Sequence, residues 1–139
     1  MTDLFIDTDV IIDFLIDRKP YSGEAAIIFT LVEEKKLRAY VSSLSFSNLY
    51  YVLRKVESHN KVLSKLESIS EMLSILKVDR QTIKNALATG FPDFEDSIQY
   101  CCARASKRVD VLITINTKDY KKSEIPVMTP AEFLKTVSS

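Results

Sequence analysis

The sequence predicts an α/β fold, a three-layer α/β/α sandwich with a mainly parallel central sheet. Short apolar runs alternate with segments of helical periodicity, and polar side chains directly follow several of the runs. Strands of parallel sheets are continuously apolar because helices cover both of their faces. The chain has 139 residues, which is enough to bury one core, so we expect a single domain over residues 1–139.

Four segments have the length and composition of buried strands. They are residues 4–6, 38–42, 111–113 and 125–128. Residues 75–78 fit either a fifth short strand or an extended turn. Parallel strands are joined by right-handed crossovers, so the carboxyl ends of these strands should meet at one edge of the sheet.

Apolar residues at helical spacing predict helices between these strands. The expected helices cover residues 8–15, 24–32, 46–53, 61–73, the residues after Asp79, 93–107 and those after Pro130. Candidate N-caps are Asp7 or Thr8 for the first helix and Ser43 or Ser45 for the third. In the helix over 93–107 we expect an apolar stripe of Phe94, Ile98, Cys101 and Ala105.

Composition excludes several classes of protein. Lys plus Arg and Asp plus Glu each number 19, so the formal net charge is zero and a uniformly basic nucleic-acid coat is excluded. No apolar run approaches the roughly 18 residues of a membrane helix. The N-terminus has no basic segment before an apolar one, so we expect no membrane association and a cytoplasmic protein. Its adjacent cysteines, Cys101 and Cys102, suit reduced thiols better than a disulfide or a zinc site.

Acidic and polar residues are predicted to converge at the carboxyl edge of the sheet, where ligands bind in open α/β folds. Asp7 ends the first strand, and Thr114, Asn116 and Asp119 follow the third. The helix from Asp93 contributes Glu95 and Asp96 in its first turn. An acid at the tip of an apolar strand needs a partner because a buried, unpaired charge is unfavourable. Either Mg²⁺ or Mn²⁺ or a set of protein hydrogen-bond donors can be that partner.

Five segments together resemble the PIN-domain family. In chain order they are FIDTDVIIDFL, VSSLSFSNLYYVL, PDFEDSIQYCCA, VLITINTKDY and IPVMTPAEFL, and they span essentially the whole chain. The chain is most similar to the small bacterial members that include VapC-type toxin ribonucleases. This resemblance implies a PIN-like three-layer fold and Mg²⁺- or Mn²⁺-dependent hydrolysis of RNA phosphodiester bonds. It also implies a cognate antitoxin protein as partner and a homodimer.

The same resemblance implies roles for individual residues. It assigns the catalytic positions to Asp7, Asn48, Asp96, Asn116 and Asp119, and the metal to Asp7, Asp96 and Asp93. Supporting positions around them are Thr8, Asp9, Ser43, Asp93 and Thr114. Many members carry Glu where this chain has Asn48, and Asn116 also brings no charge.

This departure keeps a second hypothesis open. A catalytically weakened PIN fold could bind RNA or a protein without cleaving it, because Asn48 and Asn116 replace possible acidic ligands. The sequence contains no glycine-rich loop of the kind that binds nucleotide phosphates, so a nucleotide-binding α/β protein is disfavoured. Two clusters, Lys35, Lys36 and Arg38 and then Lys118, Lys121 and Lys122, are candidate phosphate contacts.

Overall fold

The computed structural model describes residues 1–137 and contains a five-stranded sheet in the order β3-β2-β1-β4-β5. The strands are β1 (Thr2–Ile6), β2 (Leu37–Ser42), β3 (Ser74–Leu76), β4 (Val111–Ile113) and β5 (Val127–Met128). All four strand pairings are parallel. The predicted parallel α/β sheet is therefore confirmed, with the strand that ends at Asp7 in its centre.

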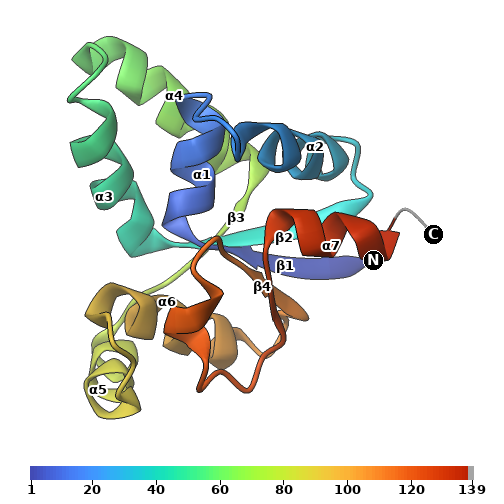
Figure 1. Ribbon diagram of the computed structural model, residues 1–139. Coiled ribbons are helices and arrows are strands. Elements are labelled where there is room, and N and C mark those ends of the chain that lie inside the picture. The colour runs from blue at the N-terminus through green and yellow to red at the C-terminus, as the bar shows by residue number, and fades with distance from the viewer. Residues whose placement is uncertain (138–139) are drawn as a thin grey trace.

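Helices cover both faces of the sheet (Figure 1). They are α1 (Thr8–Leu15), α2 (Ser22–Glu33), α3 (Ser43–Leu53), α4 (His59–Met72), α5 (Arg80–Thr89), α6 (Phe94–Ser106) and α7 (Pro130–Val137), with a short 3-10 helix η1 (Thr117–Tyr120). In Figure 1, α5 and α6 lie below the sheet and α1 to α4 above it. No helix within residues 1–137 is long and apolar enough to cross a membrane.

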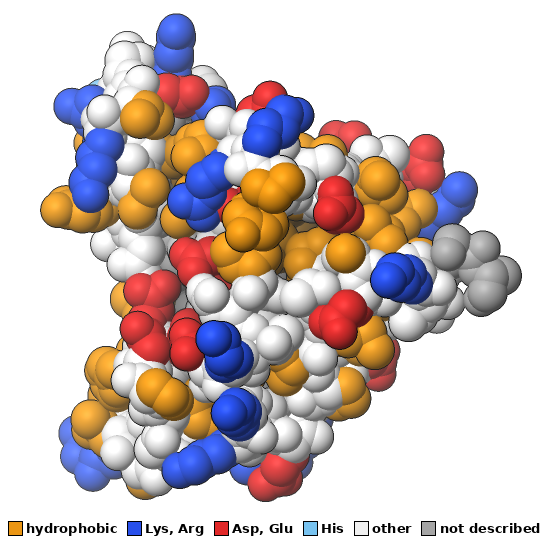
Figure 2. Space-filling view, in the orientation of Figure 1, with side chains coloured by type: hydrophobic (Ala, Val, Ile, Leu, Met, Phe, Trp, Pro, Cys, Tyr) orange, Lys and Arg blue, Asp and Glu red, His pale blue; other side chains and the backbone are white. Residues whose placement is uncertain are grey.

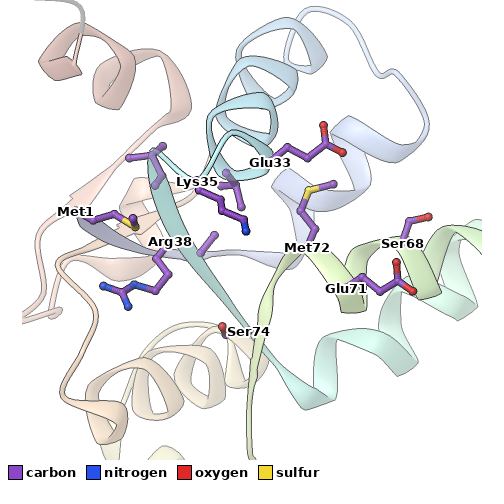
Figure 3. A pocket seen from close by; sticks show the side chains of 11 residues that line it. Met1, Glu33, Lys35, Arg38, Ser68, Glu71, Met72 and Ser74 are labelled. Carbon is purple, nitrogen blue, oxygen red and sulfur yellow. The ribbon is translucent and has the colours of Figure 1, made fainter.

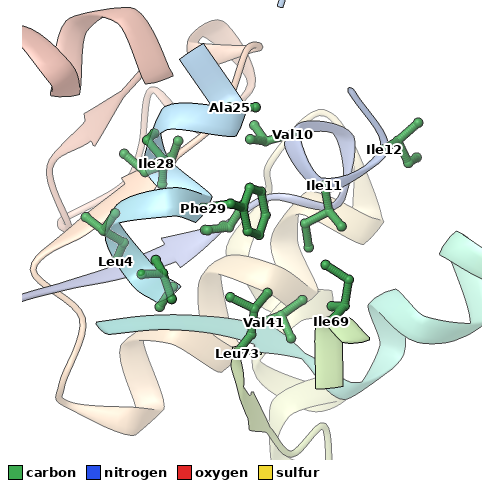
Figure 4. Close-up of a cluster of buried hydrophobic side chains, with 14 of the residues drawn as sticks. Leu4, Val10, Ile11, Ile12, Ala25, Ile28, Phe29, Val41, Ile69 and Leu73 are labelled. Atoms are coloured by element: carbon green, nitrogen blue, oxygen red, sulfur yellow. The ribbon is translucent and has the colours of Figure 1, made fainter. Parts of the chain in front are cut away.

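Two hydrophobic cores fill the spaces between the layers. Successive strand residues face opposite sides of a sheet, and β1 shows this directly. Leu4 and Ile6 belong to the larger core beneath α1 and α2, whereas Phe5 belongs to the core shared with α6. Phe29 of α2 lies within the larger core beside Ile11 of α1 (Figure 4). The sheet is thus fixed from both sides, which holds its carboxyl edge in place.

Several local predictions needed correction. Residues 74–76 form a strand, while the last strand is shorter than predicted and η1 was not predicted at all. The apolar stripe on α6 was partly wrong, because Phe94 is 49% exposed and Ala105 is also exposed. This helix packs against both the sheet and α5, so it buries the continuous stretch 97–103 instead of one stripe.

Side chains at the strand ends cap the helices that follow. The Asp7 carboxylate accepts a hydrogen bond from the Asp9 backbone N–H and caps α1, as predicted. Ser42, and neither of the two predicted serines, caps α3 by accepting from the Leu44 N–H at 3.0 Å. Asp93 caps α6. These junctions bring polar side chains to the carboxyl edge of the sheet.

Candidate active site at the carboxyl edge of the sheet

Asp7 lies at the centre of the candidate site and is only 3% exposed. Its Oδ1 accepts hydrogen bonds from the Asp9 N–H at 3.3 Å and from Gln99 Nε2 at 3.0 Å. Its Oδ2 accepts from Thr114 Oγ1 at 2.7 Å and from the Tyr120 hydroxyl at 3.2 Å. A carboxylate has about four lone-pair sites, and here four neutral donors face them, one from neighbouring Asp9 and three from distant segments.

Asp96, in the first turn of α6, shares two of these donors. Its Oδ1 accepts from the Tyr120 hydroxyl at 3.1 Å and lies 3.4 Å from Gln99 Nε2. A phenol has a single proton, so Tyr120 donates to Asp7 or to Asp96 at any moment. The two carboxylates are therefore neighbours, and the bonds that join them can shift between one and the other.

Gln99 connects the parts of the site, although sequence analysis gave it no role. Its side chain is 1% exposed, and its Oε1 accepts from both the Thr8 N–H at 3.0 Å and Thr8 Oγ1 at 2.9 Å. Thr8 Oγ1 also lies 2.7 Å from the Ser45 hydroxyl of α3. Gln99 thus ties α6 to the start of α1. Its position three residues after Asp96, on the same flank of the helix, was the available signal.

The site carries more negative charge than its surroundings balance. Burial, together with the nearby charges of Asp7 and Asp93, raises the pKa of Asp96 to about 8. Burial is also the main cause of the raised pKa values of Asp9 and Glu95. Within the described part of the chain, none of these acids forms an ion pair with Lys or Arg. Figure 2 shows the acidic side chains gathered between α3, α6 and η1.

The two asparagines at family-motif positions each bind an acid of this site. A hydrogen bond from Asn48 lowers the pKa of Glu95 and partly offsets the effect of burial. Asn116 Nδ2 donates to Asp9 Oδ2 at 3.3 Å, and the Asn116 N–H donates to Thr114 Oγ1 at 3.0 Å. The structure therefore brings both asparagines to the site, where they act as neutral donors.

The remaining predicted residues lie at different places. The charge of Asp119, in η1, contributes to the raised pKa of Asp96, so it belongs to the same region. Asp93 is exposed, and its Oδ1 accepts from the Asp96 N–H at 3.0 Å. Ser43 is exposed too, but its hydroxyl accepts from the Val78 N–H at 3.1 Å. Ser45, and not Ser43, contacts the Asp7 network through Thr8.

The donor set fits a divalent cation with few protein ligands. Within residues 1–137, no three His, Cys, Asp or Glu side chains form a ready metal-binding group. Mg²⁺, however, usually binds through only one or two carboxylates, with water and substrate phosphates completing its coordination. Asp7 and Asp96 provide such a pair in a region with uncompensated negative charge. A cation there would take over lone pairs that Tyr120 and Gln99 now occupy.

A family model described as the PIN domain matches residues 3–118. The chain belongs to the PIN domain family. Its similarity to Ribonuclease VapC1 of Aquifex aeolicus (strain VF5) is 27% identity over 135 residues, covering 94% of this chain and 92% of that protein. This membership agrees with the resemblance drawn from the sequence motifs.

Solved structures show the same PIN-domain fold at low sequence identity. One is in VapBC2 from Rickettsia felis bound to a promoter DNA fragment, with a TM-score of 0.70 and 15% identity over 92% of this chain and 98% of that one. Another is in DNA-bound VapBC from Salmonella typhimurium, with a TM-score of 0.68 and 21% identity over 94% of this chain and 99% of that one. These likenesses confirm the predicted three-layer fold.

Proposed function

We propose that this PIN domain is a ribonuclease that hydrolyses RNA phosphodiester bonds with Mg²⁺ or Mn²⁺, as the toxin of a toxin–antitoxin module. The observation that carries the proposal is the buried Asp7 beside Asp96 in a region of uncompensated negative charge. The relative from Aquifex aeolicus is named a ribonuclease, and one structural neighbour is a toxin–antitoxin complex from Klebsiella pneumoniae. Both names support the same activity and the same kind of partner. A homodimer remains a prediction.

Asp7 and Asp96 would hold the cation. When bound, it would act as a Lewis acid on the phosphodiester and make a water molecule more acidic. The hydroxyl of Tyr120 and the amide of Gln99 keep the two carboxylates next to each other before substrate arrives. Thr114, at the end of β4, fixes the second oxygen of Asp7. The chain thus contributes a preorganised pair of carboxyl groups on rigid elements.

The hydrolysis requires no covalent nucleophile from the protein. Both cysteines are buried on α6, and burial raises the pKa of the Cys102 thiol to about 11. A thiol in that state is unreactive at neutral pH. His59, the only histidine, is exposed and lies beside Tyr50 at the start of α4, in a different region from Asp7. The proposed chemistry therefore depends on the carboxylates.

The test is cleavage of a labelled single-stranded RNA by the wild type in Mn²⁺. We expect cleavage that stops in EDTA and falls by at least about a hundredfold in Asp7→Asn and Asp96→Asn. Circular dichroism should show that both variants are folded. RNA binding without cleavage, at any concentration of Mn²⁺ or Mg²⁺, would contradict the nuclease and favour the alternative of a weakened RNA-binding PIN domain. The alternative is considered because neutral Asn48 and Asn116 replace possible acidic ligands.

A further inference from the structure

An RNA strand approaching the acidic site meets repulsion, because within residues 1–137 Asp7, Asp9 and Asp96 form no ion pair with Lys or Arg. The molecule as a whole offers no general attraction, since its formal net charge is zero. Phosphate binding in such a protein requires a local group of Lys and Arg side chains near the site. A surface groove with an excess of positive charge meets this requirement.

One groove of about 600 Å³ lies between the end of α5, the second half of α6 and the segment after η1. Its charged lining consists of Arg104, Lys107, Lys122 and a single acid, Glu124, which leaves two net positive charges. Glu124 pairs with Arg104 at 3.0 Å. Neither Lys107 nor Lys122 forms an ion pair with any carboxylate in residues 1–137. We call this feature the basic groove.

The basic groove shares a wall with the candidate active site. Phe91 lines the groove, and its ring meets the Tyr120 ring edge-on, with centroids 5.7 Å apart. The hydroxyl of Tyr120 in turn contacts Asp7 and Asp96. Along α6, Lys107 lies eleven residues beyond Asp96, or roughly 16 Å at the rise of an α-helix. Figure 2 shows Lys and Arg side chains beside the acidic cluster, over η1 and the segment that follows it.

A second groove, of about 540 Å³, differs from the basic groove in charge and position, and both differences favour the basic groove as the RNA-binding surface. It lies by the amino ends of β2 and β3, away from Asp7, and Lys35 and Arg38 line it together with Glu33 and Glu71 (Figure 3). Its charged side chains, two cations and two acids, balance each other. Lys35 lines this groove, and Lys36 next to it pairs with Glu34 at 3.4 Å. These two lysines supply a control of equal charge for those of the basic groove.

We propose that the basic groove binds backbone phosphates of single-stranded RNA that extends from the cleavage site. This rests on the proposed function, because the groove is assigned to the same substrate. Phe91 and Tyr100 also line the groove, but both are buried and cannot stack on a base. The available donors are the ammonium groups, so the groove contacts phosphates and should bind RNA with little regard to its sequence.

The experiment measures fluorescence anisotropy of a labelled single-stranded RNA of about ten nucleotides, in EDTA and over a range of salt concentrations. The test variant is Lys107→Gln with Lys122→Gln, and the control is Lys35→Gln with Lys36→Gln. Each pair changes the net charge equally. A third variant, Lys107→Arg with Lys122→Arg, keeps the charge, and thermal unfolding of all variants checks the fold.

We expect the test variant to bind about tenfold more weakly at low salt, with a salt slope reduced by about 1.4, corresponding to two lost phosphate contacts on a single strand. The control and the Arg variant should bind within about twofold of the wild type. If RNA affinity falls equally in the test and control variants, or falls in neither, the proposal that the groove binds RNA is wrong. So does a wild type that fails to bind in EDTA.

Cleavage of the same RNA in Mn²⁺ separates this proposal from the proposed function. If the wild type cleaves but the test variant binds as well as the wild type, the groove is wrong and the nuclease stands. If the wild type neither binds nor cleaves the RNA, both proposals fail. Weaker binding confined to the test variant, in a wild type that cleaves, supports both.

Discussion

Asp7 and Asp96 are held together by neutral donors, although each carries a negative charge when ionised. Gln99 and Tyr120 contribute an amide and a hydroxyl, and neither can neutralise a carboxylate as a Lys or Arg would. Like charges at close range and burial both disfavour ionisation. The metal-free site should therefore destabilise the fold, as is common where a site is built for a ligand.

The pH dependence of the free energy of unfolding measures how far folding disfavours the ionisation of Asp96. The pKa of Asp96 rises from 3.8 to about 8 on folding. Below pH 3.8 Asp96 is protonated in both the folded and the unfolded state, so the fold has its full stability there, and that stability is lost as pH rises through 8. We expect Asp96→Asn in EDTA to be more stable than the wild type at pH 8, by about 1 kcal/mol, and to lose less stability between pH 5 and 8. Chemical denaturation at the two pH values measures both, and identical pH profiles would contradict the assignment.

At the residue scale, the sequence predicted the charged residues and missed two of their neutral partners, Gln99 and Tyr120. Asp7, Asp96 and Thr114 meet as expected because each follows a strand or begins a helix. The contacts of Gln99 and Tyr120 depend on how α6 and η1 pack against β1, which no local pattern reveals. Ser43 and Ser45 show the same limit, since residues two apart on a helix point about 200° apart.

At the scale of elements, the junctions between strands and helices build the site. Asp7 ends β1 and caps α1, Ser42 ends β2 and caps α3, and Asp93 caps α6 so that Asp96 falls in its first turn. Capping preferences predicted the cap of α1 but not that of α3, which is Ser42. Three-residue β3 and four-residue η1 were harder, because so few residues show no clear period.

Asp93 caps α6 and was also predicted as a metal ligand, and substitutions at this position separate the two roles. Because its carboxylate accepts from the Asp96 N–H, Asp93→Ala should lower stability by about 1 kcal/mol, whereas Asp93→Ser should restore most of it. We expect both variants to keep Mn²⁺ affinity within about tenfold of the wild type, since one nearby charge is lost but no ligand. Thermal unfolding and calorimetry measure the two quantities. Loss of Mn²⁺ binding in a stable Asp93→Ser would make Asp93 a ligand.

At the scale of the whole molecule, a zero net charge conceals a separation of charges. Acids gather at the carboxyl edge of the sheet (Figure 2), and the basic groove lies beside α6, which is below the sheet in Figure 1. The α/β fold was predictable because alternating strands and helices permit few arrangements and because five family motifs occur in order. The basic groove was not predictable from the sequence, because Lys107 and Lys122 are far apart in the chain and line the same groove only after folding.

Mn²⁺ binding by isothermal titration calorimetry, with the wild type beside Asp7→Asn and Asp96→Asn, tests the central claim most directly. The claim is that these two carboxylates form one cation site. We predict that the wild type binds Mn²⁺ at neutral pH and that affinity falls by about a hundredfold or more in each variant, because each removes one of only two carboxylate ligands. Unchanged Mn²⁺ affinity in either variant would contradict the site.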